Sequence, residues 1–454
     1  MRLFTKDRSF YRSLVTLAIP VALQNLITFA VSFADNLMVS SLGDAAVSGV
    51  YIGSQIQTFL QTFSAGIEGA ILILSAMYWG KKDTSGIRKI VSIGLCFSLV
   101  FGLLLTLLCF FLPRPVLSLF TNDQNVLDAG VQYLKIVCFS YLFFCLTQAL
   151  IAAMRSVEVA MIGMGVSLIS LLFNVTLNYG MIYGKLGFAP MGIEGAALAT
   201  LISRIVEAAV MVFYVFAHDK KLGYRLKNVL KIDKELLPDF IRYGLPIMGG
   251  QVVWSINLMT NSAIMGRYGE TVITAVSVAN TMNTLAYVTM NGMSSAVGVI
   301  TGKTIGAGRA DKMREYAKTV QILFLCLGLV TGLAITLLKK PFIGLYAGIS
   351  SGAADYSWQL ITVLSVTMIG TCYQAAGLFG LVKSGGDVSF VFRNDAIFVF
   401  LVVIPSALLA SHFGAPVWVV YACLKCDQIL KCIVAFFKIN SYNWMKNLTR
   451  EHQE

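Results

Sequence analysis

A single carboxylate stands alone inside an apolar stretch near the start of the sequence. Asp35 lies in LQNLITFAVSFADNLMVSSLG, with no basic residue close to it along the chain. A lone carboxylate in apolar surroundings is costly unless it takes up a proton, binds a cation or finds hydrogen-bond donors. Asp35 is therefore a candidate site for a proton or a small cation. The competing interpretation is a carboxylate that is merely hydrogen-bonded inside a helix bundle.

Neutral oxygen-bearing side chains follow in two later apolar stretches. Asn174 and Asn178 are four residues apart in SLISLLFNVTLNYGMIYG, so a helix places them on one face. Thr200 in GIEGAALAT adds a hydroxyl. Together with Asp35 these groups form an oxygen-rich set that suits a small hard cation such as Na⁺, provided that the fold brings them together. The alternative for each Asn or Thr is a structural hydrogen bond between helices.

Other charged residues in apolar stretches are weaker candidates. Glu68 is a possible second titrating group, unless it lies near enough to a helix end to be solvated. Arg204 and Glu207 are three residues apart, which is the spacing of a local ion pair with a structural role. Four charged residues late in the chain are predicted to face the membrane interface: Asp395, Lys425, Asp427 and Lys431.

A set of neutral polar residues mixed with Met and aromatic side chains indicates the wall of a substrate cavity. Such a wall suits large cationic or amphipathic molecules, through cation–π contacts and adaptable methionines. The alternative is that the methionines only fill gaps in the core. The candidate residues are Gln55, Gln251, Asn257, Asn261, Asn280 and Asn283.

The composition shows what kind of structure must position these residues. The chain has 454 residues, of which 57% are hydrophobic and only 13% are charged. With about 20 apolar residues per span, such a chain holds about a dozen membrane helices. The sequence predicts an all-α polytopic membrane protein with twelve transmembrane helices. The expected spans are 14–40, 47–79, 90–112, 127–154, 161–183, 193–217, 240–265, 272–302, 315–338, 355–382, 390–411 and 415–438.

The basic residues predict the orientation of the chain in the membrane. If both termini are cytoplasmic, 28 of the 35 Lys and Arg residues fall on the cytoplasmic side and six on the opposite side. The remaining one, Arg204, lies within a span. We therefore expect a multi-pass protein of the plasma (inner) membrane with both termini in the cytoplasm. The net charge of +12 then needs no nucleic-acid partner to explain it.

An internal repeat divides the chain into halves. Shifting the sequence by 226 residues places Pro20 on Pro246, and it also superimposes several glycines. The sequence predicts two pseudo-symmetric six-helix lobes, 1–217 and 240–454, joined by a cytoplasmic linker at 218–239. This layout is typical of alternating-access transporters. At the same offset Asp35 aligns with Asn261, so only the first lobe carries the carboxylate.

Motifs for other chemistry are missing from the sequence. Lys303 stands in TGKTIGAGR, which does not match the phosphate-binding loop GxxxxGK[ST]. The three histidines lie in a loop, at a helix end and in the tail, so an intramembrane histidine catalyst or metal site is not expected. We expect no enzyme activity, no cofactor and no nucleotide partner, so that transport would be driven by an ion gradient.

The chain resembles the multidrug and toxic compound extrusion (MATE) family over nearly its whole length. The resemblance rests on AIPVALQNLITFAVSFADNLMVSSLG, on the Asn174-x-x-x-Asn178 spacing, on GIEGAALAT and on VITGKTIGAGR. It implies a secondary antiporter that exports organic cations and drugs in exchange for H⁺ or Na⁺. It also implies that Asp35, Asn174, Asn178 and Thr200 belong to an ion site in the N-terminal lobe.

Two departures bear on the branch of the family. The NorM branch carries a glutamate eight residues after the seventh-helix proline, where this chain has Trp254, and Cys372 stands near the position of its tenth-helix aspartate. The chain is thus more similar to the DinF-like branch, although Asn178 replaces a second aspartate found in some of its members. We expect a monomer with small-molecule and lipid partners. The alternatives are a flippase of the same superfamily, for lipid or lipid-linked oligosaccharide, and a channel or receptor-like module.

Overall fold

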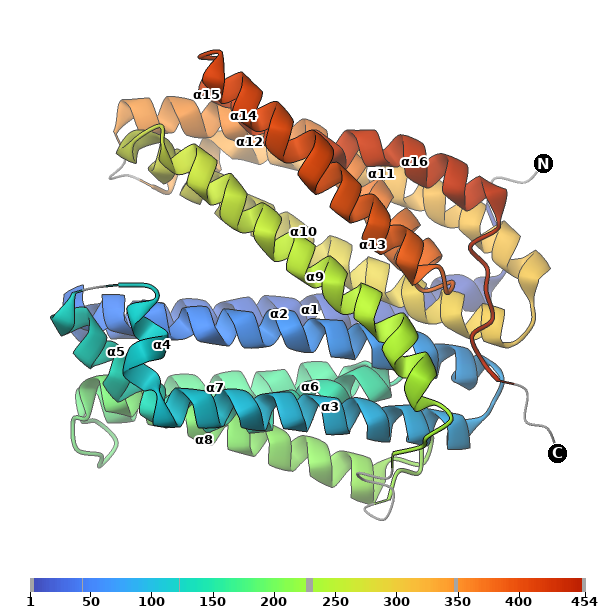
Figure 1. Ribbon diagram of the computed structural model, residues 1–454, viewed down its shortest axis with the longest axis horizontal. Coiled ribbons are helices and arrows are strands. Elements are labelled where there is room, and N and C mark those ends of the chain that lie inside the picture. Colours follow the sequence, from blue (N-terminus) through green and yellow to red (C-terminus); the bar gives the residue numbers. More distant parts are fainter. Residues whose placement is uncertain (1–3, 43, 122, 226–231, 347–349, 451–454) are drawn as a thin grey trace. The chain divides into compact units, whose positions relative to one another are not determined.

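The computed structural model describes residues 4–42, 44–121, 123–225, 232–346 and 350–450 (Figure 1). Within these ranges every regular element is a helix and no strand occurs. The first half contains α1 (Arg8–Val39), α2 (Asp44–Gly80), α3 (Thr84–Phe111), α4 (Pro113–Ser118), α5 (Gln124–Val137), α6 (Ser140–Ser156), α7 (Met161–Tyr183) and α8 (Gly192–Phe213). The second contains α9 (Leu237–Gly266), α10 (Glu270–Gly306), α11 (Ala310–Gly344), α12 (Ser351–Gln374), α13 (Val388–Ile397), α14 (Ile404–His412), α15 (Val417–Leu424) and α16 (Asp427–Ser441).

Three helices continue into π-helical segments. α8 is extended by η2 (Tyr214–His218) and α12 by η4 (Ala375–Lys383), while η5 (Phe398–Val403) joins α13 to α14. These three segments, and α15 with α16, overlap four of the spans expected from hydropathy, 193–217, 355–382, 390–411 and 415–438. Eight of the described helical segments are long and apolar enough to cross a membrane, and the pair α5 and α6, bent by 52°, would make a ninth. The predicted all-α polytopic fold is confirmed.

Local sequence signals define several helix ends. The Asp83 side chain accepts a hydrogen bond from the backbone N–H of Gly86 and caps α3, and Asp123 caps α5 in the same way. Gly184 follows α7 in the left-handed region at φ +66°, where a side chain would be strained and would meet Pro190. This turn brings the chain back so that α8 packs along α7.

Two structural units emerge from the packing of the chain. The N unit contains the described residues of Leu23–Gly244. The C unit contains the described residues up to Ala22 together with those from Leu245 onward. α1 and α9 each belong partly to both units, and each changes unit within two residues of a repeat-related proline, Pro20 or Pro246. The lobe boundaries predicted from the sequence, which place each of these helices in one lobe, stay a prediction.

Close contact between α11 and α12 shows how small residues set the packing in the C unit. A Cβ added at Gly328 would lie 2.8 Å from the Ile369 carbonyl oxygen, and one added at Gly332 would lie 2.5 Å from that of Ser365. Real side chains do not approach a backbone this closely. The two glycines, four residues apart, therefore allow the α12 backbone to lie directly against α11.

Candidate functional site

The structure brings the carboxylate of α1 together with the two asparagines of α7 inside the N unit. The Asn178 side-chain nitrogen Nδ2 donates to Asp35 Oδ1 at 2.6 Å and to Asn174 Oδ1 at 3.2 Å. Both asparagines are 1% exposed. The amide of Asn178 thus uses its donors on one charged and one neutral oxygen, and the three predicted side chains form one hydrogen-bonded chain.

The other end of the Asn178 amide has no partner. Its oxygen, Oδ1, is buried and makes no hydrogen bond within the described structure. Buried polar atoms without a partner are rare in folded proteins, because each loses its hydration without compensation. An unpartnered amide oxygen next to a carboxylate is the kind of ligand that a proton-bearing group or a small cation would satisfy.

Thr200 lies near this chain but does not join it. Its hydroxyl donates to the backbone oxygen of Ala196 at 3.1 Å, and no hydrogen bond connects it to the carboxylate or the two asparagines in the ranges that the structure describes. The phenol of Tyr133, on α5, contacts the side chains of Thr200 and Ser54 and lies within electrostatic reach of Asp35. Tyr133 was not predicted from the sequence; the only signal would have been a tyrosine in the buried stripe of α5.

A second polar group extends the same face of α7. The Ser170 hydroxyl, one turn before Asn174, donates to Glu207 Oε2 at 3.2 Å. Arg204 Nη1 lies 2.6 Å from the same Glu207 oxygen, so the predicted i, i+3 ion pair is present. The Arg204 guanidinium also stacks on the ring of Phe144 at 5.2 Å and acts electrostatically on Asp35. Ser170, Asn174 and Asn178 thus share one face of α7, with the Asp35 carboxylate bonded at one end and this ion pair at the other.

Glu68 belongs to a separate part of the N unit. It lies on α2 and interacts electrostatically with Arg155 at the end of α6. The Arg155 guanidinium in turn donates to Gln24 Oε1 at 3.1 Å. Arg155 lies 87 positions later in the chain, so only the packing of α2 against α6 brings its charge close to Glu68. The role of Glu68 as a second titrating group stays a prediction.

The neutral candidates for a cavity wall fall in different units. Gln55 lies half-buried on α2 in the N unit, and the remaining five lie on α9 and α10 in the C unit. Asn257 and Asn261, four residues apart on α9, both have a buried Oδ1 without a hydrogen-bond partner among the described residues. Asn280 is exposed and Asn283 is half-buried on α10, and Gln251 is half-buried on α9. Their role in a cavity stays a prediction.

The prediction of an interfacial face late in the chain is wrong for Asp395, Asp427 and Lys431, which are buried in the C unit. Lys431 Nζ lies 2.9 Å from Asp395 Oδ1 and 3.1 Å from Asp427 Oδ2. The ammonium therefore neutralises two carboxylates from different helices. The sequence could not reveal this network, because Asp395 and Lys431 lie on different helices, α13 and α16, and only the fold brings them together. Lys425 is half-buried and lies 5.8 Å from the ring of Tyr421.

A cation at Asp35 would depend on neutral oxygens. In the part of the chain that the structure describes, no group of three or more His, Cys, Asp or Glu side chains could hold a metal ion. Asp35 would supply the only full negative charge among the predicted ligands Asn174, Asn178 and Thr200. One carboxylate with amide and hydroxyl oxygens is compatible with a proton or a monovalent cation, whereas a divalent transition metal favours nitrogen or sulfur ligands.

Comparison with known proteins agrees with this architecture. The model of the MatE family matches residues 20–180 and 246–409. The chain is 23% identical to the probable multidrug resistance protein YoeA of Bacillus subtilis over 421 residues, covering 91% of this chain and 90% of that protein. It is 27% identical to the probable multidrug resistance protein NorM of Pseudomonas aeruginosa, covering 90% and 85%.

A solved structure shows that the fold is shared. The chain aligns with a MOP superfamily transporter from Pyrococcus furiosus with a TM-score of 0.86 at 19% identity, over 99% of this chain and 100% of that one. The placement in the DinF-like branch stays a prediction. The two matched segments begin at the repeat-related prolines Pro20 and Pro246 and together cover more than half of the sequence. The chain belongs to the MATE family.

Proposed function

We propose that this protein is a secondary antiporter that exports organic cations and drugs in exchange for H⁺ or Na⁺, with Asp35 as the group that binds the coupling ion. The names of its relatives, probable multidrug resistance proteins, support the substrate class. The chain acts as a monomer in the plasma membrane with both termini in the cytoplasm, needs no cofactor besides the coupling ion and is not an enzyme. The 28 to six distribution of basic residues supports that orientation.

One observation carries the proposal: Asn178 donates to Asp35 while its own amide oxygen is buried without a partner. In the charged form the carboxylate is stabilised by the N–H of Asn178. A proton on Asp35 removes the need for that donor. A cation bound to Asp35 competes with the Asn178 N–H for the carboxylate and is coordinated by the Asn178 amide oxygen. Either event changes the hydrogen bonding between α1 and α7.

The position of Asp35 on α1 supports a link from ion binding to conformation. α1 runs from residues that pack in the C unit to residues that pack in the N unit, with Pro20 near the change. Proline removes one backbone hydrogen bond of the helix and permits a local bend. A change of ligation at Asp35 repacks α1 near Pro20 and favours one of two states of the transporter, so that substrate leaves on the outer side.

The neutral polar residues form the proposed substrate wall. Gln55, Gln251, Asn257, Asn261, Asn280 and Asn283 present amide groups among Met and aromatic side chains. Such a wall binds large cations by cation–π contact and dispersion without a fixed set of ionic partners. A flippase for lipid or lipid-linked oligosaccharide would need cationic residues at this depth for a pyrophosphate, and few Lys or Arg residues lie in the middle of the spans.

The decisive experiment measures efflux of a fluorescent organic cation from oriented proteoliposomes. A Na⁺ gradient and a pH gradient are imposed separately on the wild type, on Asp35→Asn, and on Asp355→Asn as a control that changes an exposed carboxylate of the C unit. We expect one gradient to drive efflux, Asp35→Asn to abolish it and the control to retain it. Efflux by Asp35→Asn at the wild-type rate would refute the role of Asp35. No efflux under either gradient by folded protein would favour the flippase.

A further inference from the structure

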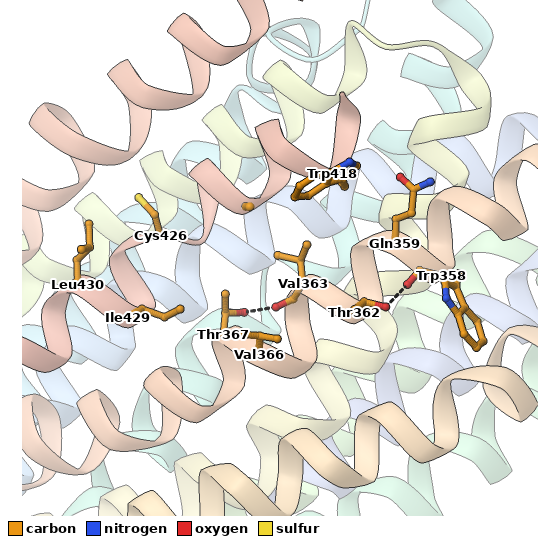
Figure 2. A pocket seen from close by; sticks show the side chains of 11 residues that line it. Trp358, Gln359, Thr362, Val363, Val366, Thr367, Trp418, Cys426, Ile429 and Leu430 are labelled. Carbon is orange, nitrogen blue, oxygen red and sulfur yellow. Dashed lines mark hydrogen bonds between the residues drawn. The ribbon is translucent and has the colours of Figure 1, made fainter. Parts of the chain in front are cut away.

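An apolar groove lies on one face of the C unit, apart from the residues of the proposed ion site. Its volume is about 780 Å³, and its walls are one stripe of α12 and the side of α15 and α16 (Figure 2). This volume is within the range of about 300–1,000 Å³ that is typical of sites for small ligands. Several wall residues are large, apolar and exposed, among them Val366, Ile429 and Leu430. At the depth of a membrane span such a surface faces acyl chains.

The length of the groove corresponds to one leaflet of a bilayer. The α12 wall runs from Trp358 to Thr367, which is about 14 Å at 1.5 Å per residue. Half of a hydrocarbon core of about 30 Å is about 15 Å. Trp358 and Trp418 stand at the same end of the groove (Figure 2). Tryptophan prefers the boundary between headgroups and acyl chains, so this end is expected at the membrane surface.

Two hydroxyl groups in the α12 wall form hydrogen bonds within the protein. The Thr362 hydroxyl donates to the Trp358 carbonyl oxygen at 2.7 Å, and the Thr367 hydroxyl donates to that of Val363 at 3.0 Å (Figure 2). Neither threonine hydroxyl therefore needs a hydrogen bond from an occupant of the groove. Most of the wall is apolar, so the groove offers hydrocarbon contact along its length.

A positive charge is fixed at the tryptophan end. Lys339, on α11, donates from Nζ to Thr362 Oγ1 at 3.0 Å and lies 3.9 Å from the centre of the Trp358 ring. Lys340 follows it and is exposed. No carboxylate forms an ion pair with Lys339 among the residues that the structure places. The ammonium is held in position by a neutral oxygen and an aromatic face, so its charge remains available to an anion.

We propose that this groove is a binding site for an anionic phospholipid, with an acyl chain along α12 and α16 and the phosphate at Lys339. An apolar channel of one leaflet's depth with a cation at its surface end complements the charge and shape of such a lipid. The bound lipid would contact α12, α15 and α16 with its acyl chain and α11 with its phosphate. The site does not depend on the proposed antiport, because none of its residues belongs to the ion site or to the substrate wall.

The test uses full-length protein in nanodiscs that contain a phosphatidylglycerol with a photoactivatable acyl chain. Labelled peptides are mapped by mass spectrometry, and the measurement is repeated with the matching phosphatidylcholine. Ala422→Trp fills the groove, and Val363→Phe does so from the opposite wall. Leu329→Trp, on an exposed part of α11, is the control for added bulk. Lys339→Gln removes the charge, and Lys185→Gln is the control for an exposed lysine elsewhere.

We expect labelling concentrated in peptides 358–367 and 418–430, and a loss of most of it in the two groove-filling variants but not in Leu329→Trp. Lys339→Gln should lower the preference for phosphatidylglycerol over phosphatidylcholine by about threefold or more, on the scale of one Lys at an anionic surface. Labelling spread evenly over exposed helix faces, or unchanged by Ala422→Trp and Val363→Phe, would show bulk lipid contact only and overturn the proposal. Displacement by an organic cation but not by unlabelled phosphatidylglycerol would identify the occupant as a drug and overturn it too.

Discussion

Asn178 and Asp35, 143 positions apart in the chain, are joined by a hydrogen bond of 2.6 Å in which the amide nitrogen donates and the carboxylate accepts. The same amide leaves its oxygen buried and unpartnered within the described structure. The contact links α1 to α7 through a group whose charge can change. Such a bond stabilises the charged carboxylate more than the protonated one, because the charged form is the stronger acceptor.

Replacing Asn178 by Leu should slow ion-coupled efflux by about tenfold or more, because a hydrogen bond to a charged group contributes about 1.5–3 kcal/mol. The measurement is the initial rate of efflux from proteoliposomes under the driving gradient. Asn125→Leu, at an exposed position of α5, serves as the control. Equal rates in Asn178→Leu and the wild type would show that the amide has no part in coupling.

The ion pair between Arg204 and Glu207 should stabilise the N unit. Glu207 is 1% exposed, so Glu207→Gln leaves the guanidinium without its partner in a buried site, where such a loss costs about 3–5 kcal/mol. We expect a clearly lower thermal unfolding temperature in detergent. The double variant Arg204→Met with Glu207→Met should recover part of the loss, because it removes both charges. A single variant as stable as the wild type would contradict this role.

Lys431 should matter for stability far more than an exposed lysine does. Lys431→Met leaves Asp395 and Asp427 buried without their shared cation. Lys312→Met removes only a partly exposed pair with Asp7, and such surface pairs contribute about 0–1 kcal/mol. Thermal unfolding of both variants should therefore show a large decrease for the first and a small one for the second. Similar decreases would contradict the assignment of a buried network.

Asp7, which precedes the first span, should make stability depend on pH. Hydrogen bonds from Ser9 and from the Tyr316 hydroxyl, the latter at 2.6 Å, hold the pKa of this carboxyl well below its usual range. A carboxyl with a lowered pKa in the folded state contributes stability above its unfolded pKa of about 3.9, and loses it as the pH falls through the folded value.

The variant Asp7→Asn should therefore unfold at a lower temperature than the wild type at pH 7, and the difference should shrink below about pH 4. Tyr316→Phe, which removes one donor to the carboxylate, should show the same trend with a smaller amplitude. Unfolding temperatures measured from pH 3.5 to pH 7 check both variants. A difference that stays constant over this range would show that the carboxylate does not titrate as described.

Gly332→Val should separate α11 from α12. A Cβ at this position would lie 2.5 Å from the Ser365 carbonyl oxygen, so the backbones must move apart. Overpacking of this kind costs about 1–3 kcal/mol. Gly344→Val, at a position of α11 with open space around it, is the matched control. Thermal unfolding should decrease for the first variant and change little for the second, and equal behaviour would contradict the close packing.

Hydropathy predicted the helices well, because a membrane span must satisfy its own backbone hydrogen bonds and is therefore a local property of the chain. The spacing of Asn174 and Asn178 likewise placed them on one face, and the spacing of Arg204 and Glu207 predicted their ion pair, which the structure contains. Each of these predictions concerned residues on one helix. Periodicity alone suffices for such cases.

Contacts between helices could not be predicted in the same way. The sequence assigned Lys431 to an interface because its partner Asp395 lies on another helix. For the same reason the sequence did not indicate that the charge of Arg155 lies close to Glu68. The convergence of Asp35 with Asn178 was conditional on the fold for the same reason. No local pattern in a single sequence specifies which helices will be neighbours.

The division of α1 between the two units has a consequence for the order in which this protein can mature. The described residues up to Ala22 are synthesised before the N unit, yet they pack with described residues from Leu245 onward, which leave the ribosome only after the N unit is complete. The first part of α1 therefore reaches its packing partners only after the C unit has been synthesised. Until then, the rest of the same helix attaches it to the N unit. A truncated product that ends before Leu245 would carry an unpaired first half of α1.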